Sequence, residues 1–311
     1  MPKFTNGHYY SLNQYLHEQF GCKVYKLALS GGFTCPNRDG SLDTRGCIFC
    51  SAGGSGEFAA DAPSVSQQIE IAKARVSKKI SSGKYIAYFQ SFTSTYLPTE
   101  RLENMLAEAV SNESICAVSL ATRPDCLPEG VLSIITRFNE IKPIWVELGL
   151  QTVNDCTAKY IRRGYATSVY YEAAEKLRSR GINTIVHVIL GLPGESREDI
   201  LSTVRCVGST ADGIKLQLLH VLKGTDLEQE YTAGKFDTLS QEEYIDLICA
   251  CIEELPENIV IHRLTGDGDK RLLVAPLWSA NKKAVLNALN KEINHRHVIQ
   301  NRRQPAAVPY S

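Results

Sequence analysis

Apolar segments of strand length and helix length alternate through most of this 311-residue chain. Runs such as residues 185–190 (IVHVIL) are apolar almost throughout, which is typical of parallel strands buried on both faces. Six strand–helix units predict an α/β fold whose parallel sheet has right-handed crossovers and forms an open, partial (β/α)6 barrel. The expected strands are 23–30, 85–90, 116–121, 144–150, 182–190 and 213–219.

Amphipathic segments between these strands have the three-to-four-residue spacing of helices. The expected helices are 8–19, 64–80, 100–110, 129–138, 154–161, 168–180, 198–207 and 241–253, followed by a further strand at 259–264 and a final helix at 284–293. We expect an N-terminal extension (1–24), a barrel (25–255) and a C-terminal extension (256–311). The last of these carries a basic helix, and we expect its tail beyond residue 297 to be loosely ordered.

Three cysteines stand in the loop expected after the first strand, in the segment GFTCPNRDGSLDTRGCIFC. Cys47 and Cys50 form a CxxC pair, and eleven residues separate Cys35 from Cys47. In barrel-type sheets the site lies at the carboxyl ends of the strands, where this loop also falls. Iron–sulfur clusters are usually held by four thiolates, so three thiolates on a four-iron cluster would leave one iron open to a small molecule.

The cysteine spacing by itself leaves other interpretations open. A structural zinc site closes with four protein ligands, and Cys22 or His8 would then be a distant fourth ligand. A redox-active CxxC pair and a chance arrangement also fit the spacing. The chain has ten cysteines, and we expect the others to be reduced thiols, because cytosolic proteins form few disulfides.

The composition is that of an ordinary globular protein with an uneven charge distribution. Residues 1–30 lack the apolar core of a signal peptide and no apolar run approaches ~20 residues, so we expect a cytoplasmic protein with no membrane partner. The formal net charge of +0 argues against a wholly basic nucleic-acid binder. Residues 281–311 nevertheless hold six basic residues and one acidic residue. That surplus fits either a solvated terminal helix and tail or a phosphate-binding patch.

Polar side chains recur at the carboxyl ends of five expected strands, on the side of the cysteine loop. Taken singly, Glu147, Gln151 and Lys215 also fit a buried hydrogen-bonded network, because buried charges need partners. His187 within an apolar strand is also typical of a satisfied core histidine. Five polar strand ends that face one loop together favour a ligand site.

Several of these segments resemble a known family. From about residue 25 to 244, the motifs TRPD, VELGLQT, RRGY, HVILGLPGE and VLKGT resemble radical S-adenosylmethionine (SAM) domains of the Elongator catalytic-subunit type. They are more distantly similar to oxygen-independent coproporphyrinogen oxidases. The opening GFTCPNRDG…GCIFC and the ending HRLTGDG…APLWSANK resemble a small bacterial branch that is linked to wobble-uridine modification of transfer RNA.

The resemblance implies a set of cofactor ligands. Cys35, Cys47 and Cys50 would hold a [4Fe–4S] cluster whose open iron chelates SAM. The residues that would contact SAM are Ser91, Thr93, Arg123, Gln151, Arg163, His187 and Gly191. The chain departs from the family where Gln90, Ser91 and Phe92 replace a Gly-rich segment, and where Ala121 stands in place of a ribose-binding glutamate. Side chains or shifted backbone must then serve in place of those glycines.

The same resemblance implies the reaction. A 5′-deoxyadenosyl radical would act on the 5-carboxymethylaminomethyl side chain of the tRNA wobble uridine and leave 5-aminomethyluridine. Arg162, Lys215 and Lys223 are candidates for holding its carboxylate, and a one-electron donor such as flavodoxin or ferredoxin would be a partner. One alternative is a radical SAM enzyme of a small metabolite or porphyrin-like substrate. The other is a non-catalytic protein that binds zinc or a cluster.

Overall fold

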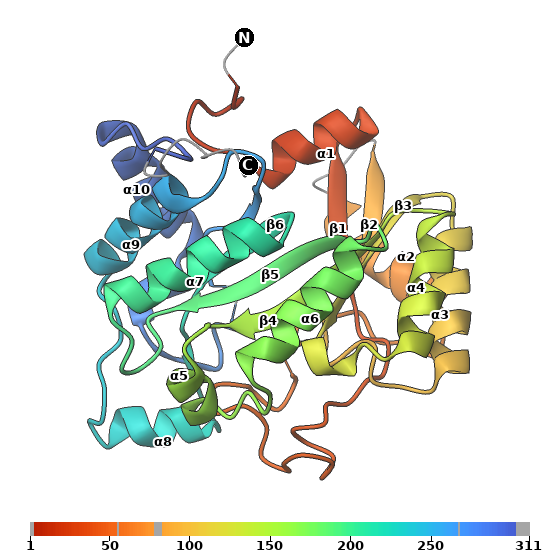
Figure 1. Ribbon diagram of the computed structural model, residues 1–311, viewed down its shortest axis with the longest axis horizontal. Coiled ribbons are helices and arrows are strands. Elements are labelled where there is room, and N and C mark those ends of the chain that lie inside the picture. The colour runs from red at the N-terminus through yellow and green to blue at the C-terminus, as the bar shows by residue number, and fades with distance from the viewer. Residues whose placement is uncertain (1–2, 55, 78–82, 267, 303–311) are drawn as a thin grey trace, which may run out of the picture.

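The computed structural model describes residues 3–54, 56–77, 83–266 and 268–302. Its centre is a seven-stranded parallel sheet in the order β1-β2-β3-β4-β5-β6-β8, which curls into a half-barrel (Figure 1). The predicted partial barrel is therefore confirmed, and the further strand expected at 259–264 pairs with β6 as β8. The strands are β1 (Val24–Leu29), β2 (Lys84–Phe89), β3 (Ile115–Thr122), β4 (Ile144–Gln151), β5 (Asn183–Leu190), β6 (Gly213–Leu218) and β8 (Val260–Arg263).

Helices cover the outer face of this sheet. Most begin and end within a few residues of the predicted ranges, and several are fixed by side-chain caps, such as the capping boxes of Ser196 and Ser240. The helices are α1 (Leu12–Phe20), α2 (Val65–Val76), α3 (Thr99–Ser111), α4 (Glu129–Asn139), α5 (Asp155–Tyr160), α6 (Thr167–Arg178), α7 (Arg197–Thr210), α8 (Asp226–Thr232), α9 (Gln241–Glu254) and α10 (Lys282–His295). None of the helices in the described ranges is long and apolar enough to cross a bilayer.

The main hydrophobic core lies between the sheet and the outer helices. Each of six helices contributes an aliphatic side chain that is fully buried, and burial of each such side chain contributes about 1.5–3 kcal/mol. These residues are Ile69, Leu106, Ile135, Leu177, Val204 and Ile248. The core therefore holds the strands in place from outside and leaves the concave face of the half-barrel for polar residues.

One helix and two short strands were missed by the sequence analysis. Helix α8 has seven residues of mixed polarity, which is too short for a reliable helical period. Strands β7 (Val221–Leu222) and β9 (Leu273–Ala275) form a separate two-stranded antiparallel sheet. Pairing between such short segments depends on the tertiary fold, because neither has enough residues to show an alternating pattern.

The N-terminal segment and the end of the chain are joined at the amino ends of the strands. The ring nitrogens of His8 lie 2.8 Å from the Val298 carbonyl and 2.9 Å from the Asn294 amide oxygen. The Tyr10 amide donates to the Gln300 side chain at 2.8 Å. Val298 and Gln300 are each only 1% exposed. The prediction of loose order beyond residue 297 was therefore wrong for 298–300, and the rest of the tail from 303 lies outside the described residues.

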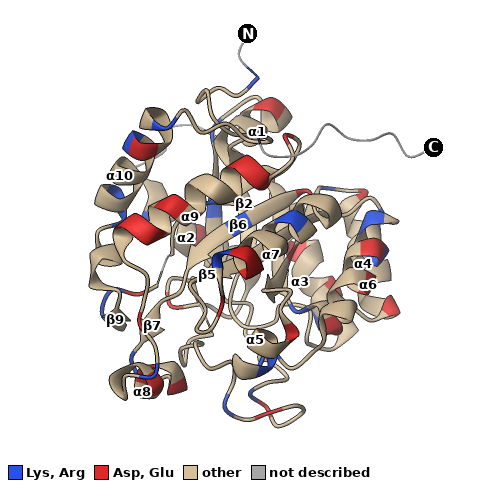
Figure 2. Cartoon of the chain, turned by 60° about the vertical axis from the view of Figure 1, so that its left-hand side comes forward, with Lys and Arg blue, Asp and Glu red and all other residues tan. Residues whose placement is uncertain are grey.

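The basic C-terminal extension is partly neutralised by acidic neighbours (Figure 2). Arg296 forms ion pairs of 2.6 Å with Asp246 on α9 and 2.7 Å with Glu292 on its own helix. Arg302 lies 3.8 Å from Glu253. These contacts agree with the solvated-helix interpretation for both arginines. The phosphate-patch interpretation now depends mainly on the lysines of α10.

Candidate active site

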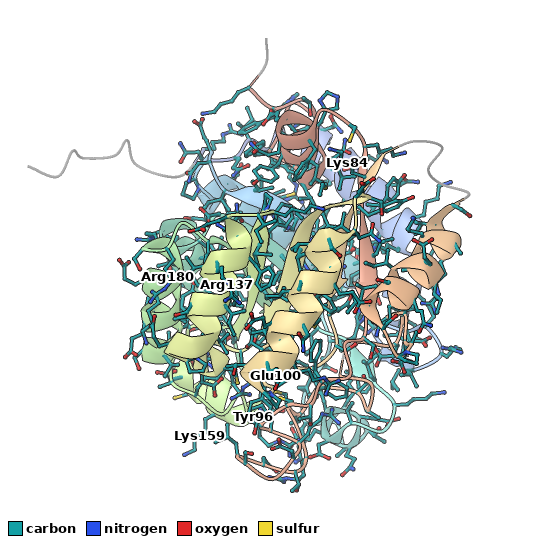
Figure 3. The ribbon with its side chains drawn as sticks, turned by 90° about the vertical axis from the view of Figure 1, so that its right-hand side faces the viewer. Lys84, Tyr96, Glu100, Arg137, Lys159 and Arg180 are labelled. Atoms are coloured by element: carbon teal, nitrogen blue, oxygen red, sulfur yellow. The ribbon has the colours of Figure 1, made fainter. Side chains whose placement is uncertain are left out.

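One cavity of about 250 Å³ opens at the carboxyl ends of the strands. Figure 3 shows the two ends of the barrel: Lys84 begins β2 at one end, and Tyr96 lies at the other. The Tyr96 hydroxyl is 2.8 Å from the hydroxyl of Ser41 in the cysteine loop, so this second end is the end of the cavity. Cys35, Cys47 and Cys50 all line the cavity, as the sequence analysis predicted.

The cysteine loop is held by turns and by Asn37 and Arg38. The Arg38 amide donates to the Cys35 carbonyl at 2.8 Å, and the Cys50 amide donates to the Cys47 carbonyl at 3.0 Å. The Asn37 side chain donates to the Arg162 carbonyl and approaches the Cys47 sulfur at 3.4 Å. Arg38 donates to the carbonyl of Cys50. The loop therefore presents its sulfur atoms to the cavity while its backbone is tied to neighbouring segments.

Burial controls the protonation of the thiols in this loop. Burial, and then the neighbouring Cys50, raise the pKa of the Cys47 thiol to about 12. The thiol is therefore protonated unless a metal centre supplies positive charge, because thiolates bind metals and free thiols do not.

His8 has both ring nitrogens engaged at the other end of the barrel, and Cys22 neighbours Cys116 there. Neither proposed fourth zinc ligand is at this site.

No group of three His, Cys, Asp or Glu side chains within the described ranges is placed to hold a single metal ion. The three thiols nevertheless share one cavity, which a four-iron cluster, being wider than one ion, would suit. Three cysteine ligands also leave one iron of such a cluster open. The residues present therefore fit the cluster that the sequence analysis proposed.

Gln151 provides the second sign of a ligand in this cavity. Its backbone is left-handed, with a φ of 69°, at an irregularity in the pairing of β4 with β5. Its side-chain oxygen is buried and has no hydrogen-bond partner. A Cβ on Gly149 would lie 3.0 Å from Nε2 of the Gln151 side chain. The absence of a side chain at Gly149 therefore makes room for this conformation of Gln151. A strained residue with an unsatisfied buried acceptor fits a polar ligand such as SAM.

The loop after β2 has Gln90, Ser91 and Phe92 where the resemblance implied a Gly-rich segment. Phe92 has a φ of 52°, a left-handed conformation that glycine usually adopts. Glycines stand opposite it instead: a Cβ on Gly54 would lie 2.3 Å from the Phe92 ring, and one on Gly56 would lie 2.1 Å from the Ser91 hydroxyl. Thr93 lines the cavity, whereas Ser91 is buried against Gly56. The left-handed backbone of Phe92 is thus accommodated by the missing side chain of Gly54.

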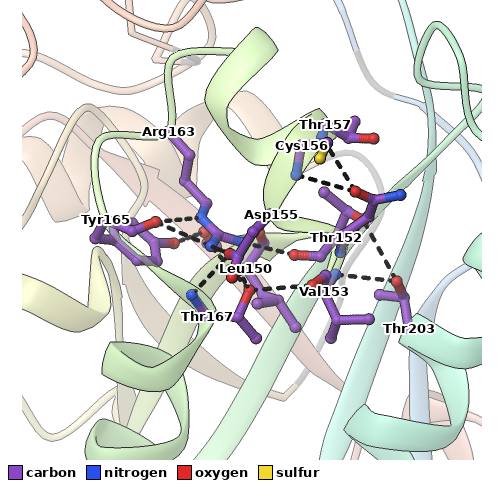
Figure 4. A network of polar contacts seen from close by, with 12 residues as sticks. Leu150, Thr152, Val153, Asp155, Cys156, Thr157, Arg163, Tyr165, Thr167 and Thr203 are labelled. Carbon is purple, nitrogen blue, oxygen red and sulfur yellow. Dashed lines mark hydrogen bonds and ion pairs between the residues drawn. The ribbon is translucent and has the colours of Figure 1, made fainter.

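Arg163 also lines the cavity, but its guanidinium is engaged by the protein (Figure 4). Its Nη1 donates to the carbonyl oxygens of Leu150 and Thr152 at 3.1 and 2.6 Å. Its Nε donates to the Tyr165 carbonyl, and its Nη2 contacts Tyr165, Asp155 and the Thr167 hydroxyl. All of its N–H groups thus have protein acceptors. This geometry shows that Arg163 positions the segment after β4, and its N–H groups are already engaged where the resemblance implied a contact with SAM.

Arg123 has a related arrangement. It forms a two-point contact with Asp125 at 2.9 and 2.7 Å and donates to the Arg163 carbonyl at 2.8 Å. Both arginines lie over the Tyr165 ring, at 5.1 Å for Arg123 and 4.5 Å for Arg163. The two guanidinium groups therefore stiffen one wall of the cavity.

A hydrogen-bonded polar layer crosses the concave side of the sheet beneath these residues. Buried Glu147 accepts from Lys26 and Ser119 on one oxygen, each at 2.7 Å. Its other oxygen accepts from Lys215 and lies 2.8 Å from Nε2 of His187. Lys215 also donates to the Tyr88 hydroxyl at 3.0 Å. The polar layer consists of Lys26, Tyr88, Ser119, Glu147, His187 and Lys215, one residue from each of β1 to β6.

The charges of the polar layer are set by burial and by each other. Burial alone would raise the pKa of Glu147, but Lys215 and Lys26 lower it well below its ordinary value. Burial lowers the pKa of Lys215 to about 7 despite the attraction of Glu147. Burial, and then Lys215, lower the pKa of His187 to about 4, so this imidazole is neutral. The buried network expected from Glu147 and Lys215 is present, without Gln151.

The three predicted substrate residues lie apart from one another. Arg162 pairs with Asp226 and lines a separate cavity, and the exposed Lys223 lines neither cavity described here. The ammonium of Lys215 is held by Glu147 in the polar layer. Gly191 has a φ of 88° and lies beside Leu239 without lining the main cavity. The geometry does not support Arg162 or Lys223 as carboxylate ligands in this cavity.

Other residues that line the cavity were not predicted. These residues come from the cysteine loop, the end of β6 and the segment HRLTGDG. No sequence pattern singled them out, and HRLTGDG was noted only as part of a motif. They are Arg38, Glu57, Gln217, His220 and Arg263.

Comparisons with known proteins decide the family. Residues 44–207 match the model of the radical SAM superfamily, and residues 211–295 match the radical SAM C-terminal domain. The chain belongs to the radical SAM superfamily. Membership identifies this protein as an enzyme and implies SAM and a [4Fe–4S] cluster as its cofactors.

Individual relatives place this radical SAM enzyme near the Elongator type. The chain is 45% identical over 294 residues to the uncharacterized protein YtqA of Bacillus subtilis, covering 94% of this chain and 91% of YtqA. It is 31% identical over 152 residues to the tRNA uridine(34) acetyltransferase of Dehalococcoides mccartyi, covering 48% of this chain and 32% of that protein. The solved structure of Elp3 from Methanocaldococcus infernus matches with a TM-score of 0.68 at 18% identity, covering 89% and 64% of the two chains.

Proposed function

We propose that this radical SAM enzyme modifies the wobble uridine of tRNA, converting its 5-carboxymethylaminomethyl side chain to 5-aminomethyl. The observation that carries the radical chemistry is the single cavity shared by three cysteine thiols and the unsatisfied Gln151 amide. The similarity of about half the chain to a tRNA uridine(34) acetyltransferase supports uridine as the substrate.

The residues of the cavity have separate tasks in this proposal. Cys35, Cys47 and Cys50 would hold the cluster, and Gln151 and Thr93 would orient SAM. When bound, the two cofactors supply a 5′-deoxyadenosyl radical that removes a hydrogen atom from the substrate. Arg123 and Arg163 keep the wall beside them rigid through their contacts with Asp125 and Tyr165. Such rigidity holds the reacting atoms close together.

The proposed side chain suits hydrogen removal. Its methylene group lies between a nitrogen and a carboxylate, so removal of a hydrogen atom leaves a stabilised carbon radical. Loss of one electron from that radical to a one-electron acceptor would give an imine, and addition of water to the imine would release glyoxylate and leave 5-aminomethyluridine. Proteins recognise single-stranded RNA loops by splaying bases out of the stack, and an open half-barrel admits a splayed base. A cytoplasmic one-electron donor such as flavodoxin or ferredoxin completes the proposal.

Mass spectrometry of tRNA nucleosides tests this function directly. Cells that lack the gene should accumulate 5-carboxymethylaminomethyluridine and lose 5-aminomethyluridine, and the purified, reconstituted enzyme should restore the product under anaerobic conditions with SAM and a reductant. Unchanged nucleosides in both experiments would contradict the proposed substrate and favour a small metabolite or porphyrin-like compound instead.

A further inference from the structure

Glu57 brings a carboxylate to the cavity that holds the three thiols. It lies shortly after Cys50 in the loop between β1 and α2, and it lines the cavity together with the cysteines. Among the described residues of this lining, the other carboxylate is that of Glu147, and each of its oxygens already has two contacts in the polar layer. Glu57 is therefore the acidic side chain of the cavity whose role is still open.

One oxygen of the Glu57 carboxylate is held by its own loop. The hydroxyl of Ser51, the residue directly after Cys50, donates to Oε1 of Glu57. Ser51 is buried, so water does not compete for this contact. A Cβ on Gly53 would lie 3.0 Å from the same oxygen, so the missing side chain of Gly53 makes room for the carboxylate. The carboxylate thus has a fixed place beside the segment of Cys50.

The second oxygen, Oε2, has no hydrogen bond with any residue that the structure describes, and within the same residues Glu57 makes no ion pair. Three arginines that line the cavity are engaged elsewhere. Arg38 donates to two backbone carbonyls of the cysteine loop, and Arg123 is paired with Asp125. Arg163 has protein acceptors for all of its N–H groups. Oε2 is therefore an acceptor that a ligand can use.

The neighbouring wall of the cavity is the loop after β2, and two of its backbone amides are already used. The Phe92 amide donates to the Gly54 carbonyl at 2.9 Å, and the Thr93 amide donates to the Thr34 carbonyl at 3.1 Å. Gly54 belongs to the same segment as Glu57, so this wall adjoins the carboxylate. With these amides engaged and a carboxylate beside them, the wall favours a ligand group that donates hydrogen bonds over one that accepts them.

We propose that Glu57 binds the α-amino group of SAM through Oε2. SAM has two groups that carry positive charge, and its sulfonium has no hydrogen to donate. The α-amino group has N–H donors as a free ammonium and keeps N–H donors when its nitrogen binds iron. A carboxylate accepts such bonds strongly, because its charge assists them. The inference goes beyond the proposed function, since it holds for whichever substrate this radical SAM enzyme uses.

A comparison of two ligands tests this contact on the full-length, reconstituted protein. One ligand is SAM, and the other is its deamino analogue, in which a hydrogen atom replaces the α-amino group. Anaerobic equilibrium dialysis measures both affinities for the wild type and for Glu57→Gln, which keeps the shape of the side chain and a neutral acceptor. Charge-assisted hydrogen bonds contribute about 1.5–3 kcal/mol and neutral ones about 0.5–1.5 kcal/mol, so Glu57→Gln should bind SAM about 5- to 10-fold more weakly. Both proteins should bind the deamino analogue equally.

Two further variants separate this contact from general effects of charge and folding. Asp39→Asn removes the same charge from the same loop, at an exposed side chain that accepts from the Ser41 amide and does not line the cavity. It should bind both ligands as the wild type does. Glu57→Asp keeps the charge on a shorter side chain and should weaken the binding of SAM alone. Iron and sulfide contents show whether each variant holds the cluster; should Glu57→Gln not hold it, Glu57→Asp decides by the same comparison.

The assignment would be overturned by a cluster-bearing Glu57→Gln that binds SAM as tightly as the wild type, or by one that loses affinity equally for SAM and the deamino analogue. In the place of a Glu57→Gln without cluster, a Glu57→Asp with either behaviour has the same meaning. A Glu57→Gln that binds SAM normally and loses affinity for tRNA would also overturn it, and would point to the secondary amine of the proposed substrate. Failure of the proposed function is distinguishable, because unchanged tRNA nucleosides do not bear on the affinity for SAM.

Discussion

Gln151 combines a left-handed backbone with a buried oxygen that has no partner. Each feature costs free energy in the absence of a ligand, and together they mark a position selected for contact rather than stability. The sequence placed this residue at the end of a strand, within VELGLQT. It did not reveal the strain, which comes from the irregular pairing of β4 with β5.

Replacement of Gln151 by alanine should weaken SAM binding by roughly 3- to 10-fold, because one neutral hydrogen bond contributes about 0.5–1.5 kcal/mol. Iron content should be unchanged, since the buried side-chain oxygen of Gln151 makes no hydrogen bond to the cysteine loop. Equilibrium dialysis with SAM measures the affinity. Gln229→Ala, an exposed substitution on α8, is the control. Equal SAM affinity in Gln151→Ala and wild type would remove Gln151 from the site.

Arg163 shows how one side chain can hold a whole segment. Its guanidinium joins the end of β4 to the start of α6, through contacts to Leu150, Thr152, Asp155 and Thr167. Arg163→Ala should lower the free energy of unfolding by about 3 kcal/mol, because buried carbonyl groups lose their donors. Urea unfolding measures this loss.

The control for Arg163 is Arg178→Ala, which removes an exposed pair with Glu175 and an exposed hydrogen bond to the Ser209 carbonyl, and should change stability by less than about 1 kcal/mol. Weaker SAM binding by Arg163→Ala with wild-type stability would instead support the expected contact of this residue with SAM.

At the scale of elements, the cysteine loop and the loop after β2 fit each other through Gly54 and Phe92. Gly54→Ala should greatly reduce iron incorporation, because its Cβ would lie 2.3 Å from the Phe92 ring. Gly40→Ala is a matched control: that glycine also has a positive φ, but nothing lies within 4 Å of an added Cβ. It should incorporate more iron than Gly54→Ala.

Iron and sulfide analysis after anaerobic reconstitution measures both variants. The double variant Gly54→Ala/Phe92→Ala removes the ring and should recover part of the iron. If Gly54→Ala and Gly40→Ala incorporate the same amount, backbone strain alone explains the loss and the fit between the two loops has no role.

At the scale of the whole molecule, the two ends of the chain close the amino side of the barrel. Removal of all residues after Ile293 should lower the free energy of unfolding by about 3 kcal/mol or more, since it deletes buried Val298 and the contacts of Gln300. Arg302→Ala should have little effect, because its side chain is 57% exposed and its contact with Glu253 is 3.8 Å long. Thermal melting compares the two.

This closure changes how the basic extension must be tested. A truncation would lower stability as well as any RNA binding, so the two effects could not be separated. Substitution of the exposed Lys283 and Lys291 by glutamine avoids this problem. If these lysines contact phosphates, the dependence of tRNA affinity on salt should become shallower by about 0.7–0.9 per contact in the log–log slope. An unchanged slope would place the RNA contacts elsewhere.

The sequence by itself determined the alternation of strands and helices, the three cysteines in the loop after β1 and the strand-end positions of Thr93 and Gln151. These features follow from local periodicity and spacing, which can be read from residues that are near one another in the sequence. Tertiary structure decided the direction of the Arg163 donors, the fit of Gly54 to Phe92, the place of Glu57 in the cavity wall and the pairing of His8 with Val298. Each of these depends on the packing of segments that meet only when the sheet curls, and no local pattern encodes that contact.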